Sequence, residues 1–290
     1  MQVTKNGHPQ MISAIRKPSA AGRFFPGKEK ALKDLISQML REEKPVIQSL
    51  NNLEIMGGIV PHAGYIYSGK TALHFFEALA QQKFTFDTAI ILSPNHTGWG
   101  PGVALDEHDA WETPLGIVEI DKDLSNLLDL ESSSEAHEIE HSAEVMLPML
   151  QYFFKQGLKI LPISLWDQSP LVARSLGLQL VAAKKKLGKK ILVIASTDFS
   201  HYVSPEFGIE QDDMALDRIA QFDISGLSRV IHQNDISICG YGPVMTLLAM
   251  AKLIYQKPAF KILSRSHSGN TIKSEEVVHY VSGVVFNAAQ

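Results

Sequence analysis

The sequence predicts a single α/β domain with a central mixed, mostly parallel sheet and helices on both faces. Short runs rich in β-branched residues alternate with longer helical patterns, as in βαβ units. The run Lys190–Ala195 is almost purely apolar, which is typical of a strand buried in a parallel sheet. The alternation contains no long linker. One domain is therefore expected, although 290 residues could also form two.

Each element follows from its own local pattern. Short β-branched runs predict strands at Met56–Val60, Thr88–Leu92, Lys159–Ser164, Lys190–Ala195, Ala259–Ser266 and Val277–Phe286. Apolar residues at helical spacing predict helices at Gly69–Gln81, Asp121–Leu130, Ser142–Phe154, Pro170–Leu187, Asp212–Phe222, Ile224–His232 and Pro243–Tyr255. Turn residues at 112–116 indicate a hairpin-like region over 102–120, and the polar stretch 267–276 is expected to be a loop.

The N-terminus and the cysteine content bear on the location of the protein. Residues 1–10 are polar and are predicted to be a disordered extension of a domain that comprises residues 11–290, with translation starting at Met1 or at Met11. The N-terminus lacks the apolar core of a signal peptide, and no apolar run reaches the roughly 18 residues of a membrane span. One cysteine excludes an intramolecular disulfide. A reducing compartment, the cytoplasm, is therefore expected.

The charge balance bears on the partners. The formal net charge is -4 and the pI is about 6.3. Nucleic acid or an anionic membrane would favour a concentrated basic face, so neither is an expected partner. Five lysines do cluster between 184 and 190, but they end a helical pattern, where cations suit the helix C-terminus. The expected partner is an unidentified small molecule or peptide, and the sequence leaves the oligomeric state open.

Three predicted strands end in the same way, with a histidine soon after the strand. These are His62 in Pro61–Gly64, His96 in Ser93–His96 and His201 in Ser196–His201. Ligands of open α/β sheets bind beyond the carboxyl ends of the strands. A single loop histidine is more often structural, but three in equivalent positions are expected to share a site. The neighbouring prolines and glycines suit a rigid binding loop, and ordinary strand-to-helix turns would need the same residues.

Two further residues are candidates for this site. His141 directly precedes the predicted helix Ser142–Phe154, which Ser142 could cap, so its ring could point from the helix end into a cleft; the alternative is a surface histidine. Cys239 also precedes a predicted helix. A helix N-terminus favours the thiolate, which is the nucleophile and the metal ligand. The alternative for Cys239 is a small buried apolar side chain.

Several motifs follow one another in a set order, namely Val60–Tyr65, Ser93–His96, Glu140–Glu144, Ser196–His201 and Cys239–Gly240. In order and approximate spacing they resemble the MEMO family, whose archaeal and bacterial members are called AmmeMemoRadiSam system protein B. The segment Arg16–Pro26 is similar to the N-terminal motif of that family. The resemblance extends from about Ile15 to Phe286, which is nearly the whole chain.

The resemblance implies a fold related to the class III extradiol dioxygenases, which are non-haem iron enzymes that open catechol rings. It implies that His62 and His96 are metal ligands and that Cys239 takes the place of the ligand carboxylate of the dioxygenases. Two histidines and a carboxylate are the usual platform for oxygen chemistry at iron(II). A thiolate is softer and open to oxidation. The cysteine therefore argues against catechol cleavage itself, while it remains compatible with a metal site.

The same resemblance implies roles for the other candidates. His201 would match the catalytic base of the dioxygenases, with Asp198 nearby and His141 lining the same cleft. An unperturbed histidine titrates near neutral pH, and Asp198, three residues earlier in the chain, is expected to orient the ring of His201 and raise its pKa. The expected cofactor is a divalent metal, iron(II), with zinc as the alternative.

Three functions are compatible with these residues. The first is a metal-dependent, iron-containing redox or dioxygenase-like enzyme of unidentified substrate. The second is a non-catalytic regulatory protein that binds a peptide or a small anion in the same cleft. The third is a zinc-dependent hydrolase that uses bound water as its nucleophile. An intact Asp198–His201 pair favours chemistry, whereas the cysteine at the third ligand position argues against the ancestral reaction.

Overall fold

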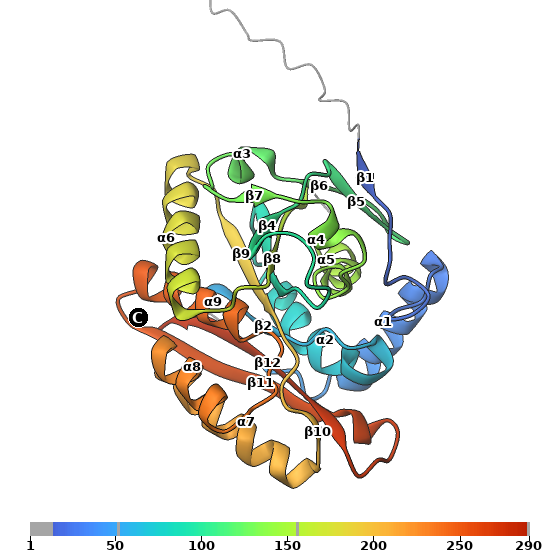
Figure 1. The fold of residues 1–290 in the computed structure, drawn as a ribbon. Coiled ribbons are helices and arrows are strands. Elements are labelled where there is room, and N and C mark those ends of the chain that lie inside the picture. Colours follow the sequence, from blue (N-terminus) through green and yellow to red (C-terminus); the bar gives the residue numbers. More distant parts are fainter. Residues whose placement is uncertain (1–13, 51–52, 155–156, 289–290) are drawn as a thin grey trace, which may run out of the picture.

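The computed structural model describes residues 14–50, 53–154 and 157–288. The predicted extension 1–10 and Met11 lie outside these ranges. The described chain forms a single α/β domain on one mixed sheet (Figure 1). The strand order is β1-β5-β6-β8-β3-β9-β2-β12-β10, and β11 pairs with β12. The predicted fold class, with its mostly parallel central strands, is confirmed.

The centre of the sheet consists of parallel strands. They are β2 (Glu54–Val60), β9 (Ile191–Ser196), β3 (Thr88–Pro94), β8 (Lys159–Leu165) and β6 (Gly116–Ile120). On the other side of β2, β12 (Val277–Asn287) runs antiparallel. All seven residues of β3 and all six of β9 are buried. Because the central strands are parallel, their carboxyl ends meet at one edge of the sheet.

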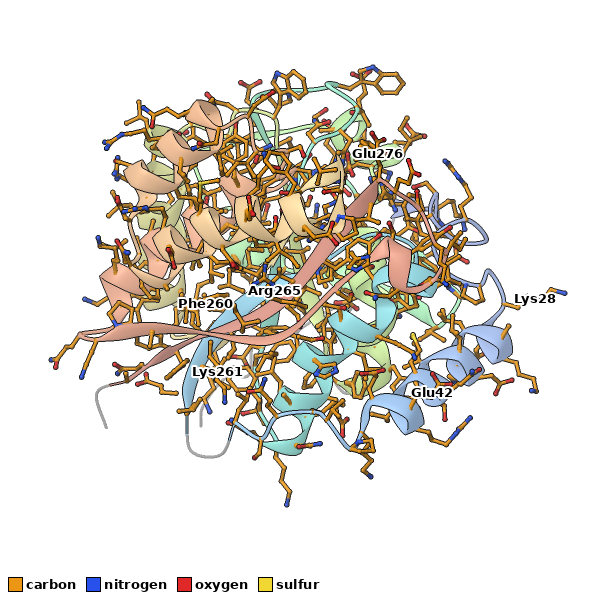
Figure 2. All side chains as sticks on the ribbon, turned by 90° about the horizontal axis from the view of Figure 1, so that it is seen from below. Lys28, Glu42, Phe260, Lys261, Arg265 and Glu276 are labelled. Carbon is orange, nitrogen blue, oxygen red and sulfur yellow. The ribbon has the colours of Figure 1, made fainter. Side chains whose placement is uncertain are left out.

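The outer strands are shorter or lie at the sheet edge. They are β1 (Ile15–Arg16), β4 (Val103–Leu105), β5 (Ala110–Thr113), β7 (Glu131–Ser132), β10 (His201–Val203) and β11 (Pro258–His267). The predicted hairpin is β5 with β6. Among the described strands β11 pairs with β12 alone, and Figure 2 labels Lys261 and Arg265 along it. Such charged side chains protect an edge strand from pairing with other chains.

Helices cover both faces of the sheet, because alternate strand residues point to opposite sides. Ile90 and Leu92 of β3 belong to the same buried hydrophobic cluster as residues of α6 (Pro170–Leu187), α7 (Pro205–Ala220), α8 (Ile224–Gln233) and α9 (Tyr241–Ile254). Ala89 and Ile91 of the same strand belong to a second cluster, with residues of α1 (Glu29–Glu43), α2 (Tyr65–Gln81) and α5 (Leu147–Phe153). Figure 1 shows α6, α7 and α8 on the left and α1 and α2 on the right.

Several predicted helix bounds were wrong. Helix α2 begins at Tyr65 and not at Gly69, and α7 begins at Pro205, seven residues before the predicted Asp212. The side chain of Ser204 accepts from the backbone N–H of Phe207 and thereby caps α7. The predicted helix over 121–130 is only α3 (Lys122–Ser125), and that over 142–154 is a 3-10 turn (Glu144–Met146) followed by α5.

Two further short helices and α1 were not predicted. The short ones are α4 (Glu135–Glu138) and a 3-10 turn (Ser268–Asn270) within the predicted loop. Helix α1 buries Leu32, Ile36 and Met39, which recur at helical spacing in the sequence. This apolar spacing by itself indicates a helix. Helix α9 is buried over most of its length. In the described part of the chain no helix is both long and apolar enough to cross a membrane.

Candidate metal centre

The three predicted metal ligands converge at the carboxyl edge of the sheet. His62 and His96 each lie two residues beyond their strands, β2 and β3, and Cys239 lies two residues before α9. One ligand atom from each of the three lies within 4.8 Å of the other two. Cys239 Sγ is 3.3 Å from His62 Nε2, and the two imidazole centroids are 5.3 Å apart. Two imidazoles and a thiol suit iron(II) or zinc.

Contacts with distant parts of the chain hold these three residues in place. The backbone N–H of His62 donates to Asp198 Oδ1 at 2.8 Å, and that of His96 donates to Glu140 Oε2 at 2.6 Å. The backbone N–H of Asp198 donates to Cys239 Sγ at 3.2 Å. His62 is buried, whereas the side chain of His96 is 35% exposed. The cluster is therefore fixed in position and still reachable from solvent.

His141 lies beside the predicted ligands and is not a free surface histidine. Its ring stacks on His96 at 5.0 Å between centroids, and on Phe24 at 4.2 Å. It also meets the ring of His62 edge-on at 5.5 Å. Ser142 does not cap a helix here, because its hydroxyl bonds to Glu140 Oε1 and to the backbone oxygen of Pro94. The position of His141 in the cluster thus comes from ring packing.

Glu140 belongs to the site, although it was not among the predicted site residues. Its Oε1 accepts from His96 Nδ1 at 3.0 Å and lies 3.4 Å from His141 Nδ1. His96, Glu140 and His141 therefore form a second group with metal-ligand spacing. The hydrogen bond from His96 to the carboxylate, and the stacking of His141 on His96, account for that spacing without a metal. Glu140 is the first residue of the motif Glu140–Glu144. Its side chain is only 1% exposed, and the sequence did not indicate this burial.

The environment sets the protonation of the three rings. Burial lowers the pKa of His62 well below its ordinary value, and the neighbouring His141 and His96 lower it further. Burial likewise lowers the pKa of His141 to about 4. Burial would also lower the pKa of His96, but the hydrogen bond and charge of Glu140 outweigh it and raise that pKa. Near pH 7 His62 and His141 are therefore neutral, and a neutral imidazole is the form that binds a metal.

The predicted contact between Asp198 and His201 is wrong for the described residues. Asp198 accepts the backbone N–H of His62 instead, and burial raises the pKa of its carboxyl to about 7. His201 Nδ1 lies 2.7 Å from the backbone oxygen of Ser237, to which it donates. Burial lowers the pKa of His201, whereas an increase was predicted. The Asp198 side chain turns toward β2, and chain spacing alone could not reveal this direction.

The thiol of Cys239 also differs from its prediction. The helix N-terminus was expected to favour the thiolate, yet burial raises the pKa of the Cys239 thiol, and the charge of Asp198 raises it further. Helix α9 begins at Tyr241, so the sulfur is not on the first helical turn. The partial positive charge of a helix acts mainly within that turn. Without a metal the sulfur therefore keeps its proton.

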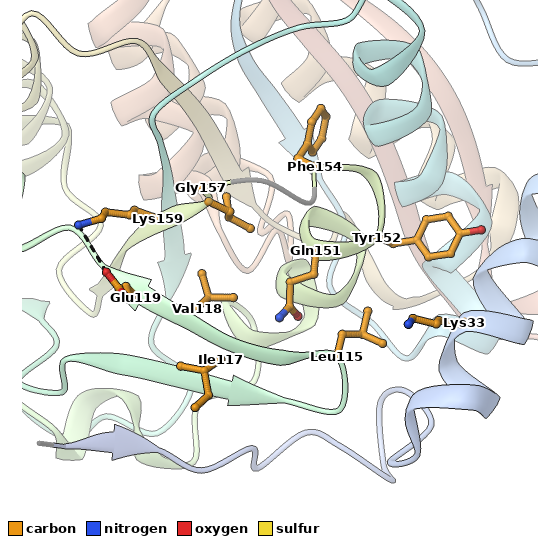
Figure 3. A pocket seen from close by; sticks show the side chains of 11 residues that line it. Lys33, Leu115, Ile117, Val118, Glu119, Gln151, Tyr152, Phe154, Gly157 and Lys159 are labelled. Atoms are coloured by element: carbon orange, nitrogen blue, oxygen red, sulfur yellow. Dashed lines mark ion pairs between the residues drawn. The ribbon is translucent and has the colours of Figure 1, made fainter. Parts of the chain in front are cut away.

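A hollow elsewhere on the molecule is separate from this cluster. It has a volume of about 720 Å³ and lies between β6, α5 and α1, with Ile117, Gln151 and Lys33 among its lining residues (Figure 3). Lys159 and Glu119 form an ion pair of 3.5 Å at its rim, and both side chains are exposed. None of the six predicted site residues lines this hollow. It therefore adds nothing to the predicted site.

A comparison with known protein families agrees with the motifs. The fold and the cluster define an α/β protein with a His–His–Cys candidate metal centre at the carboxyl edge of its sheet. The model of the family described as Memo-like protein matches residues 16–284. The chain belongs to this family, as its motifs predicted.

Two relatives illustrate the similarity. The chain is 38% identical over 279 residues to a "MEMO1 family protein" of Methanococcoides burtonii, covering 93% of this chain and all of the relative. It is 41% identical over 287 residues to a "MEMO1 family protein" of Sulfurisphaera tokodaii, covering 92% of this chain and 98% of the relative. A solved structure of an uncharacterized protein from Escherichia coli K12 shares 13% identity, covers 73% of this chain and 91% of its own, and has a TM-score of 0.45. That structure is too distant to inform on the fold, so the relation to extradiol dioxygenases stays a prediction.

Proposed function

We propose that this member of the Memo-like family is a metal-dependent redox enzyme that binds iron(II) through His62, His96 and Cys239. The observation that carries the proposal is the convergence of three ligand atoms within 4.8 Å, from three segments far apart in the chain. A bound iron(II) ion would supply a Lewis acid and a redox centre. The substrate is an unidentified small molecule that reaches the cluster from the exposed side of His96.

Metal analysis is the direct test of this proposal. Protein purified without oxygen or chelator is expected to hold about one divalent ion per chain, with iron in excess over zinc. Zinc in place of iron, with hydrolytic activity, would favour the zinc-dependent hydrolase, because the same three ligands suit both metals. Protein that takes up neither metal would contradict both forms of the proposal.

A non-catalytic binding protein is the second candidate, and one observation favours it. Asp198 accepts the backbone N–H of His62, so no described carboxylate orients His201 as a general base. In that case the cluster would recognise a peptide or a small anion without turnover. The cytoplasmic location and the partners remain predictions under either candidate.

The variant His201→Ala is expected to keep its metal and to lose its activity or its ligand response. His201 Nδ1 is held by Ser237, and the ring belongs to neither group with metal-ligand spacing. Loss of a general base typically lowers turnover about 10²–10⁴-fold. Metal stoichiometry and affinity are measured beside those of His62→Ala. If affinity falls as far as in His62→Ala, His201 is itself a ligand.

Metal binding is expected to release the thiol proton of Cys239. Burial raises the pKa of this thiol, so at pH 7 the metal-free protein holds a proton that a thiolate ligand must lose. Affinity therefore rises with pH. Cys239→Ala has no thiol proton to lose, so any metal binding that remains should release about one proton fewer. Calorimetry in buffers of different ionisation enthalpy counts these protons, and equal release by both proteins would mean that the sulfur is not a ligand.

A further inference from the structure

Ser196 is the last residue of β9, and its hydroxyl lies between two buried groups. Its Oγ is 2.8 Å from the backbone oxygen of Ser142 and 2.8 Å from Nδ1 of His62. A carbonyl oxygen only accepts, so the one hydroxyl proton donates to Ser142 and Oγ accepts from His62. If the proton turned to His62, the buried carbonyl of Ser142 would lose this donor, which is costly. His62 therefore carries its proton on Nδ1.

Glu140 acts on His96 in the same way. Both oxygens of Glu140 accept from backbone N–H groups, Oε1 from Ser142 at 2.9 Å and Oε2 from His96 at 2.6 Å, and the hydroxyl of Ser142 lies 2.7 Å from Oε1. These contacts are those of a carboxylate, which only accepts hydrogen bonds. His96 Nδ1, at 3.0 Å from Oε1, must therefore be the donor. The backbone N–H of His96 donates to the other oxygen, so ring and backbone are held by one side chain.

We infer that Ser196 and Glu140 are positioning residues that hold His62 and His96 in the Nδ1–H tautomer, so that both rings keep the Nε2 lone pair for a metal ion. The inference rests on the proposed metal site and deepens it. The Nε2 of His62 is the ring nitrogen that faces Cys239 Sγ, at 3.3 Å. Partners on the second ring nitrogen fix the tautomer and the orientation of ligand histidines.

The tautomers can be measured in metal-free protein, without any activity assay. In protein labelled with 15N at histidine, long-range proton–nitrogen spectra at pH 8 distinguish protonated from unprotonated ring nitrogens. Signals of His62 and His96 are assigned by their absence in His62→Ala and His96→Ala. Wild-type protein is expected to show protonated Nδ1 and unprotonated Nε2 in both rings. A proton on Nε2 of His62 overturns the role of Ser196, and one on Nε2 of neutral His96 overturns the role of Glu140.

Serine variants separate positioning from mere packing. Ser196→Ala is expected to give a mixture of tautomers at His62 and to lower metal affinity about 10–100-fold. Ser164→Ala is the matched control, because Ser164 also lies buried near the carboxyl end of a parallel strand, β8, and its hydroxyl has no hydrogen-bond partner in the described structure. It is expected to change neither readout. Ser196→Thr keeps the hydroxyl and should restore both.

The two readouts have distinguishable outcomes. If Ser196→Ala binds metal as tightly as Ser164→Ala and leaves the His62 spectrum unchanged, Ser196 has no positioning role. If the tautomers are as expected but wild-type protein binds no metal, the proposed function fails while the tautomer assignment stands. For Glu140 the corresponding variant is Glu140→Gln, whose amide can also donate. Nδ1 of His96 is then expected to lose its proton in part of the molecules, and an unchanged spectrum would contradict the assignment.

Discussion

His62→Ala is expected to lose its metal while the fold stays intact. The imidazole lies within ligand distance of His96 and Cys239, so its removal leaves two donors. The loss of affinity should exceed the roughly 10–100-fold that is typical when only an outer hydrogen-bond partner is removed. The fold should persist because the contact of residue 62 with Asp198 uses the backbone N–H, which alanine retains.

The measurement combines metal content with thermal unfolding. A ligand that binds only the native state stabilises it by about 2.7 kcal/mol at 100 times its Kd. Added iron(II) under anaerobic conditions should therefore raise the Tm of the wild type but not that of His62→Ala. His232→Ala is the control, since this exposed histidine belongs to neither candidate metal group and bonds to the backbone of Ser228. Equal metal content and equal Tm response in all three proteins would refute the ligand set.

Of the variants proposed for this protein, Arg16→Ala is expected to show the largest decrease in the free energy of unfolding. The guanidinium is 1% exposed and pairs with the fully buried Glu144 at 2.7 Å. It also donates to the backbone oxygens of His137 and Glu140, at 2.7 and 3.0 Å, and lies over the ring of Trp111. Removing one partner of a buried pair leaves an unpaired charge and typically costs about 3–5 kcal/mol. Arg16→Lys should not restore the stability, because an ammonium cannot make these divergent bonds.

The neighbouring residue supplies a matched control for this variant. Lys17 forms an ion pair of 2.6 Å with Glu112, but the side chains are 77% and 38% exposed. Water screens such a pair, so Lys17→Ala should cost no more than about 1 kcal/mol. Free energies of unfolding come from urea titrations of both variants. Free-energy costs of Arg16→Ala and Lys17→Ala that agree within error would mean that the buried pair does not anchor the N-terminal segment.

Because Arg16 holds the backbone of Glu140, the loss of Arg16 should also weaken metal binding.

Local pattern was enough to place His62 and His96 in one region. Parallel strands are short, apolar and separated by helices, so their carboxyl ends could be recognised along the chain. The histidines just beyond β2 and β3 then had to lie at one edge of the sheet. The family motifs added Cys239. No long-range information beyond the parallel arrangement of the strands was needed for this part.

The bounds and contacts of the helices were harder to predict from the sequence. The hydroxyl of Ser204 starts α7 well before the first clear apolar repeat. In α1 the spacing of Leu32, Ile36 and Met39 is visible in the sequence, but it stands in a segment in which most residues are polar. Helix patterns depend on which face is buried, and that face is chosen by packing against the sheet.

The sequence by itself thus determined the fold class and the family, and it predicted His62, His96 and Cys239 as the ligands of one metal site. Only the tertiary structure decided the pKa shifts of these residues and the hydrogen-bond partners that hold them in place. Glu140 meets His96 across 44 residues of chain, Ser196 meets His62 across 134, and Arg16 meets Glu144 across 128. Hydrogen-bond direction and burial at such separations follow from how whole elements pack, not from spacing. For the same reason Asp198 supports the backbone of His62 and not the ring of His201, and the Cys239 thiol keeps its proton in a buried setting.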